Sequence, residues 1–145
     1  MSDLSTSFMQ TSAMQKLGYA GLTPFVVPAI LVAMGHEHSG HAIGIANAYA
    51  FGIICFLTGT WWGVGIKSES NRLLILSNVV FVAAFLVFGF ASQSLALVLA
   101  VILACIFVIE KSDTSFSQLD PAYRRMRMVL TTIATLSMLV VFFAG

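Results

Sequence analysis

Long hydrophobic segments with short polar stretches between them dominate the chain. Five segments stand out, at residues 17–34, 44–66, 73–90, 95–110 and 126–144. A helix that crosses the hydrocarbon core of a bilayer needs about 20 apolar residues, and these segments lack the period-two alternation typical of half-buried strands. The pattern therefore predicts an all-α polytopic membrane protein, in which a bundle of five transmembrane helices (17–145) follows an N-terminal cytoplasmic or interfacial segment (1–16).

The composition agrees with this class. Hydrophobic residues make up 59% of the chain and charged residues only 9%, against about 25% charged residues in a typical soluble domain. The net charge of +1 creates no field that would attract nucleic acid. We therefore expect the lipid bilayer as the main partner, other membrane-protein subunits or a second copy as further partners, and no nucleic acid.

The basic residues predict the orientation. With five spans, the N-terminus, the 67–72 loop and the 111–125 loop lie on one side, and all seven lysines and arginines lie on or beside it: Lys16, Lys67, Arg72, Lys111, Arg124, Arg125 and Arg127. Cytoplasmic loops carry an excess of basic residues. The N-terminus is therefore predicted to be cytoplasmic, and Gly145 and the 35–43 loop to lie outside.

Several residues constrain the individual helices. Pro24 and Pro28 each remove a backbone hydrogen bond, so the first helix should kink or unwind near its start. Gly59 and Gly63 form a G-x-x-x-G pair, which allows another helix to approach closely. Asp120 before Pro121 is typical of a helix N-terminus, so the last helix should begin before its apolar run.

Two aromatic residues, Trp61 and Trp62, lie near the predicted cytoplasmic end of the second span. One interpretation is an aromatic anchor at the membrane interface. The alternative is a ligand wall that they form together with Pro24 and Pro28 of the distorted first helix. Arg124, Arg125 and Arg127 are interpreted as general anchors at the level of the lipid phosphates.

Titratable residues are rare in the predicted spans. The centres of the predicted spans lack Asp, Glu, Lys, Arg and His, and Glu110 lies at a span end, which argues against an enzyme or a proton-coupled transporter. The stretch "GHEHSGH" at 35–41 supplies candidate metal ligands in His36, Glu37, His38 and His41. A solvated loop without metal is the alternative. No cofactor is expected beyond a divalent metal at this loop.

Three motifs resemble one protein family. They are "LGYAGLTPF" at 17–25, "AYAFGIICFLTGTWWG" at 48–63 and "YRRMRMVLT" at 123–131. Together they resemble the domain of unknown function 3429 family, which includes the mitochondrial transmembrane protein 69. The resemblance implies a small multi-pass protein of the bacterial inner (cytoplasmic) or mitochondrial inner membrane, without an assigned reaction. The residues that carry it are Gly18, Gly21, Pro24, Phe25, Leu57, Gly59, Trp62, Gly63, Tyr123 and Arg127.

Three hypotheses for function follow. The first is a non-enzymatic integral inner-membrane protein that serves as an accessory or assembly partner of a larger complex. The second is a binder or transporter of a small, quinone-like or lipid molecule. The third is metal binding by the outer-loop histidines.

Overall fold

The computed structural model describes residues 16–90 and 93–145, except for the side chain of Gln118. After helical residues 16–20 and a turn at 21–22, the elements are α2 (Thr23–Ala33), α3 (Ser39–Lys67), α4 (Asn71–Phe90), α5 (Leu95–Ser112), the 3₁₀-helix η1 (Thr114–Gln118) and α6 (Pro121–Ala144). Five helical segments in this part of the chain are long and apolar enough to cross a membrane, as predicted. Residues 1–15, and with them nearly all of the expected segment 1–16, lie outside the described residues.

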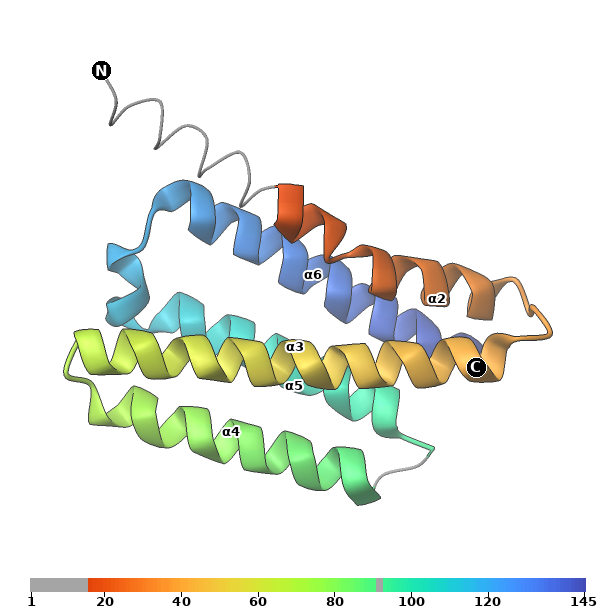
Figure 1. The fold of residues 1–145 in the computed structure, drawn as a ribbon, viewed down its shortest axis with the longest axis horizontal. Coiled ribbons are helices and arrows are strands. Elements are labelled where there is room, and N and C mark those ends of the chain that lie inside the picture. The colour runs from red at the N-terminus through yellow and green to blue at the C-terminus, as the bar shows by residue number, and fades with distance from the viewer. Residues whose placement is uncertain (1–15, 91–92) are drawn as a thin grey trace.

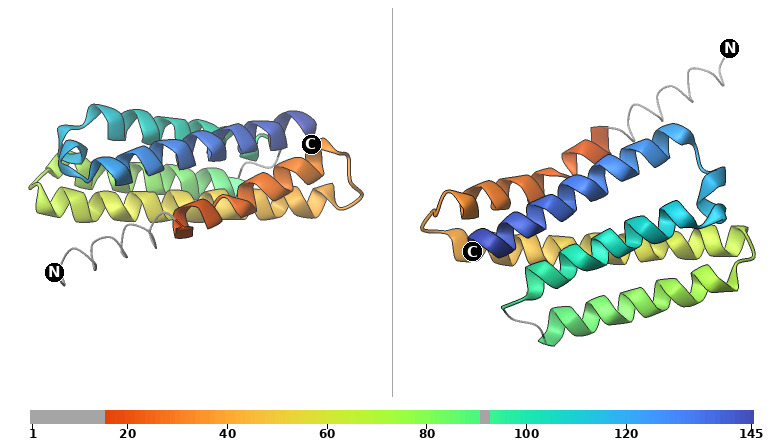
Figure 2. Two further views of the ribbon diagram at one scale, coloured as in Figure 1. Left: turned by 90° about the horizontal axis from the view of Figure 1, so that it is seen from above. Right: turned by 180° about the vertical axis from the view of Figure 1, so that it is seen from behind.

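The long helices run back and forth along one axis, with α3 in the centre (Figures 1 and 2). α3 packs against α2, α4, α5 and α6, and α5 and α6 pack against each other. Its 29 residues span about 43 Å at 1.5 Å per residue. The first helical segment starts partway along the bundle, and the C-terminus lies near the end at which α2 turns into α3 (Figure 1).

The turn before α3 differs from the prediction. α2 ends at Ala33, and Gly35 adopts a left-handed conformation (φ 63°) that lets the His36 amide donate to the Leu31 carbonyl at 3.2 Å. This is a common way to end a helix. α3 then begins at Ser39. The prediction of a loop over 35–43 is therefore wrong for its second half, and His41 lies in the first turn of α3.

The predicted distortion of the first span is confirmed. Its helix is interrupted at residues 21–22, where the Phe25 amide donates to the Leu22 carbonyl at 3.0 Å and leaves the Gly21 carbonyl to another donor. The hydroxyl of Tyr49 in α3 donates to that carbonyl at 2.9 Å. Pro28 stays inside α2. The break is therefore tied to α3 by a side-chain hydrogen bond.

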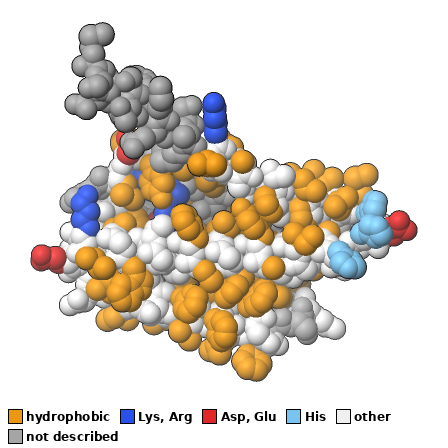
Figure 3. Space-filling model, in the orientation of Figure 1, with side chains coloured by type: hydrophobic (Ala, Val, Ile, Leu, Met, Phe, Trp, Pro, Cys, Tyr) orange, Lys and Arg blue, Asp and Glu red, His pale blue; other side chains and the backbone are white. Residues whose placement is uncertain are grey.

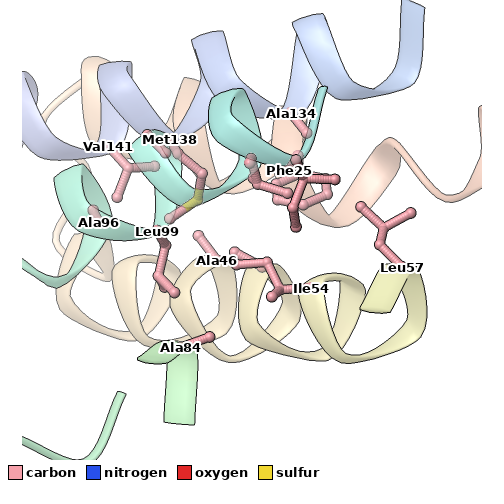
Figure 4. Close-up of a cluster of buried hydrophobic side chains, with 14 of the residues drawn as sticks. Phe25, Ala46, Ile54, Leu57, Ala84, Ala96, Leu99, Ala134, Met138 and Val141 are labelled. Carbon is pink, nitrogen blue, oxygen red and sulfur yellow. The ribbon is translucent and has the colours of Figure 1, made fainter. Parts of the chain in front are cut away.

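Alanines bring the helices together. Ala46 and Ala50 of α3, Ala84 of α4, Ala96 and Ala100 of α5, and Ala134 of α6 are all buried among larger side chains (Figure 4). Small side chains allow close backbone approach, which is how membrane helices pack without a strong hydrophobic drive. Gly59 and Gly63 do not take part, because a Cβ added at either position would meet nothing within 4 Å. The pair packs no helix within the described chain, and its packing against another chain stays a prediction.

The outside of the bundle is apolar. Large hydrophobic side chains are exposed on every long helix, and they cover the length of the visible face, while the histidines lie at one end (Figure 3). Soluble monomers rarely expose apolar patches of this extent. The basic residues of α3 to α6 lie near the opposite end, at the end of α3, the start of α4, the end of α5 and the start of α6, whereas the first helical segment, which begins with Lys16, starts partway along the bundle (Figure 1).

This arrangement predicts opposite locations for the two turns that follow α2 and α3. We expect His38→Cys to react with a membrane-impermeant thiol reagent added to intact cells, and Ser68→Cys to react only after permeabilisation, because basic ends stay in the cytoplasm. Both variants are made with Cys55 and Cys105 replaced by alanine. Labelling of both positions from the same side would contradict the five-span topology.

Candidate functional site

A buried ion pair joins α5 to α6. Glu110 lies in the last turns of α5 and Arg127 in the second turn of α6. Arg127 Nε donates to Glu110 Oε2 at 3.0 Å, and Arg127 Nη2 donates to Glu110 Oε1. The two side chains are only 9% and 12% exposed. The interpretation of Arg127 as a lipid-phosphate anchor is therefore wrong, since its charge is neutralised inside the protein.

Two aspartates fix the connection that brings these charges together. Asp113 Oδ1 accepts from the Ser115 amide at 2.9 Å and begins η1. Asp120 Oδ1 accepts from the Ala122 and Tyr123 amides at 2.7 and 3.2 Å, which confirms the predicted start of α6. Side chains that cap a helix start typically contribute about 1 kcal/mol. The caps place the second turn of α6 beside the end of α5.

Three further side chains complete a polar cluster, which consists of Thr60, Trp61, Glu110, Tyr123 and Arg127. Trp61 Nε1 donates to Glu110 Oε1 at 2.7 Å. Arg127 Nη1 donates to the Tyr123 hydroxyl at 2.9 Å and to Thr60 Oγ1 at 3.2 Å. A buried ion pair is tolerated only when hydrogen bonds satisfy its remaining donors and acceptors, and α3 and α6 supply them here.

A large apolar cavity lies next to this cluster. Its volume is about 670 Å³, and its lining comes from the first helical segment, α3, α6 and Leu103 of α5. Leu17 and Phe56 line it and are 74% and 64% exposed, so the cavity opens at the outer surface of the bundle. Tyr123 and Arg127 form a polar part of the lining.

Two glycines in the lining allow the first helical segment to lie close to α6 and α3. A Cβ at Gly18 would lie 2.8 Å from Met126 Sδ, and a Cβ at Gly21 would lie 3.4 Å from the Tyr49 hydroxyl. Both glycines line the cavity. The helix break and the missing side chains thus let the first span lie close to α3 and α6 without filling the volume between them.

A second, more polar pocket of about 180 Å³ also contacts the cluster. It lies among the end of α5, η1 and the start of α6, and its lining includes Lys111, Asp113 and Arg124 as well as Glu110 and Arg127. Arg127 therefore lines both the apolar cavity and the polar pocket.

The predicted ligand wall is not the lining of the apolar cavity. Trp61 is fully buried beside Glu110 and packs edge-on against Phe116, with ring centroids 6.1 Å apart. Trp62 is 45% exposed on the outer surface. Neighbouring residues on a helix point about 100° apart, so the two indoles cannot form one wall. Pro24 and Pro28 do not contribute to the lining either.

Half of the residues that carry the family resemblance line the cavity. Gly18, Gly21, Leu57, Tyr123 and Arg127 line it. Phe25 is buried, and its ring meets the ring of Tyr49 at a centroid distance of 5.0 Å.

The histidine-rich turn gives the metal hypothesis no support. The rings of His36 and His38 are 5.3 Å apart, and Glu37 Oε1 lies 4.0 Å from His38 Nε2 in an exposed pair. His41 is exposed in the first turn of α3. Across residues 16–90 and 93–145, no group of three or more His, Cys, Asp or Glu side chains is arranged to hold a metal.

The pairing of Glu110 with Arg127 was missed by the sequence analysis. A signal was present, because a glutamate ends a short span and an arginine begins the next one after a connection of only eight residues between α5 and α6 (113–120). From the sequence, Glu110 was placed only at a span end and Arg127 at the level of the lipid phosphates. In the structure, Asp113 caps η1 and Asp120 caps α6. The end of α5 then lies beside the second turn of α6, so Glu110 and Arg127 pair with each other.

Removing one partner of the ion pair should destabilise the protein strongly. We expect Arg127→Ala or Glu110→Ala alone to lower the free energy of unfolding by about 3–5 kcal/mol, because the remaining charge stays buried without its partner. The double variant Glu110→Leu/Arg127→Met should lose less than the sum of the single losses. Unfolding in detergent measures all of these values.

Arg125→Ala provides the matched control for this cycle. Arg125 lies on the same turn of α6 but is exposed, so its removal should change stability by no more than about 0.5 kcal/mol. Additive losses in the Glu110 and Arg127 variants would show that the pair is not energetically coupled.

Comparison with known proteins supports the resemblance drawn from the motifs. The chain matches the family described as "Protein of unknown function (DUF3429)" over residues 10–143. No curated protein and no solved structure matches it, and the relation to transmembrane protein 69 stays a prediction. Because the match covers nearly the whole chain, the protein belongs to the DUF3429 family.

Proposed function

We propose that this protein is a non-enzymatic, multi-pass inner-membrane protein that binds a lipid-soluble small molecule. The observation that carries the proposal is the apolar cavity of about 670 Å³ that meets Tyr123 and Arg127. Cavities that hold small ligands are usually about 300–1,000 Å³, mostly apolar, with a few polar groups that orient the ligand. The cavity fits this description.

The position of the opening favours a ligand that arrives from the bilayer. Leu17 and Phe56 at the opening are apolar and largely exposed. They lie on segments that are apolar enough to cross a membrane. A lipid-soluble molecule can therefore enter sideways without crossing water.

The hydrogen bonds within the polar cluster favour a binding role over catalysis. The Glu110 carboxylate already accepts from Trp61 Nε1 and from Nε and Nη2 of Arg127. A general base must be free to take a proton from a substrate. Glu110 and Arg127 are engaged with each other, and we assign the pair a structural role beside the cavity, which Arg127 lines.

Filling the cavity should remove the bound molecule. Thr131 lines the cavity and is buried, whereas the neighbouring Thr132 is exposed. We expect Thr131→Phe to lose most of the lipid-soluble compound that co-purifies with the wild type, and Thr132→Phe to retain it. Solvent extraction followed by mass spectrometry measures the amount per protein.

Ile53→Trp fills the same cavity from α3. It provides a second test in case Thr131→Phe does not fold. The unfolding temperature of each variant is compared with that of the wild type before extraction, to establish that the variant folds. Equal amounts of bound compound in all four folded proteins, or none in the wild type, would contradict the proposed function.

An accessory role in a larger complex is the second candidate, and the open glycine face of α3 favours it. A Cβ at Gly52, Gly59 or Gly63 would meet nothing within 4 Å. A transmembrane helix of another subunit could approach closely along this face.

The accessory role predicts a selective loss of assembly. We expect Gly59→Leu to fold normally but to lose a protein that co-purifies with the wild type, because the new side chain blocks backbone approach. Gly89→Leu, at an equally open glycine of α4, should keep it. Native mass spectrometry that finds a monodisperse wild type without a partner would count against this role.

A further inference from the structure

We infer that the apolar cavity selects an uncharged, quinone-type molecule whose carbonyl oxygen accepts a hydrogen bond from the Tyr123 hydroxyl. This inference rests on the proposed function, because it names the ligand class of the same cavity. It follows from the hydrogen bonds of Tyr123, from the neutralisation of Arg127 and from the aromatic residues in the lining.

The hydrogen bonds of Tyr123 leave it a donor. Its oxygen accepts from Arg127 Nη1 at 2.9 Å. A phenol has one proton to donate, and no acceptor for that proton is found in residues 16–90 and 93–145. Tyr123 lines the cavity, and the cationic donor on its oxygen makes its own O–H a stronger donor. The matching ligand group is a hydrogen-bond acceptor.

The charge of Arg127 is already compensated. Nε and Nη2 contact the Glu110 carboxylate, while Nη1 donates to Thr60 and Tyr123. An anionic head group would find no unpaired positive charge at Arg127, and it would lose its hydration in an apolar site. The polar end of the cavity therefore suits a neutral carbonyl better than a phosphate or a carboxylate.

Aromatic side chains favour a ring-bearing ligand. Tyr49, Phe56 and Tyr123 all line the cavity. Aromatic rings pack on one another with a preference for offset or edge-on geometry. The Tyr49 hydroxyl is held by the Gly21 carbonyl at 2.9 Å, which orients its ring. A molecule with an apolar tail, a flat ring and a carbonyl oxygen fits this set of groups.

Binding of three probes to the full-length protein in detergent tests the inference. The probes are decylubiquinone, decylbenzene (a ring and tail without a carbonyl) and oleate (an anion). We expect the wild type to bind decylubiquinone most tightly. Tyr123→Phe should weaken decylubiquinone binding about three- to tenfold, which is the net value of one hydrogen bond, and leave decylbenzene binding unchanged.

Tyr19→Phe is the matched control, since Tyr19 is 51% exposed and does not line the cavity. It should bind all three probes as the wild type does. Equal weakening of decylubiquinone and decylbenzene by Tyr123→Phe, no weakening at all, or tighter binding of oleate than of decylubiquinone would overturn the inference.

The outcomes separate the inference from the proposed function. Probe binding that Thr131→Phe abolishes but Tyr123→Phe leaves unchanged would overturn the inference alone. Failure of the wild type to bind any of the three probes would overturn the inference, and the absence of a co-purifying compound would then overturn the proposed function as well.

Discussion

The buried pair of Glu110 and Arg127 is the constraint on which the cytoplasmic end of the proposed topology depends. A charge removed from water without a partner is too costly to keep, whereas a paired and hydrogen-bonded one is tolerated. The remaining bonds to the pair bring in a third helix: Trp61 and Thr60 come from α3, while Tyr123 comes from α6 itself. Three helices are therefore held in a fixed register at one end, where the helices themselves offer only apolar, non-directional contacts.

The other end of the bundle is held differently. Val32, Ile43 and Gly145 lie close together there, and the contacts are apolar. Along the middle, alanines such as Ala46, Ala50 and Ala134 set the spacing between helices. Apolar packing determines how closely the helices approach, but it specifies register weakly because many similar side chains can replace one another. The polar cluster supplies the specificity that the apolar contacts lack.

The sequence predicted those features that depend on local chemistry. The number of spans follows from hydropathy, the start of α6 from Asp120 and Pro121, and the break in the first span from Pro24. The orientation of individual side chains was not predictable in the same way. Trp61 and Trp62 are adjacent, yet one is buried and the other exposed, because only the packing of α5 and η1 on α3 decides which indole faces inward.

The candidate site was likewise only partly predictable from the sequence. Five of the residues that carried the family resemblance line the cavity, but the proposed wall of Trp61, Trp62, Pro24 and Pro28 does not. The sequence places Glu110 and Arg127 at neighbouring ends of two consecutive spans, but it does not show that they pair, since a carboxylate at a helix end is usually solvated. Its role depends on the angle between α5 and α6, which η1 and the two capping aspartates determine. Long-range geometry of this kind leaves no periodic signal in the chain.

The cavity and the polar cluster are parts of one arrangement. Tyr123 belongs to both, since its hydroxyl accepts from Arg127 while it lines the cavity. The Gly21 carbonyl at the break in the first span accepts from the hydroxyl of Tyr49 in α3, and Tyr49 lines the same cavity. The walls of this apolar volume contain two polar groups that would be costly to leave alone, the free Gly21 carbonyl at the helix break and the buried charge of Arg127. Each is satisfied by a side chain from a neighbouring helix, because Tyr49 of α3 donates to the carbonyl and Glu110 of α5 pairs with Arg127.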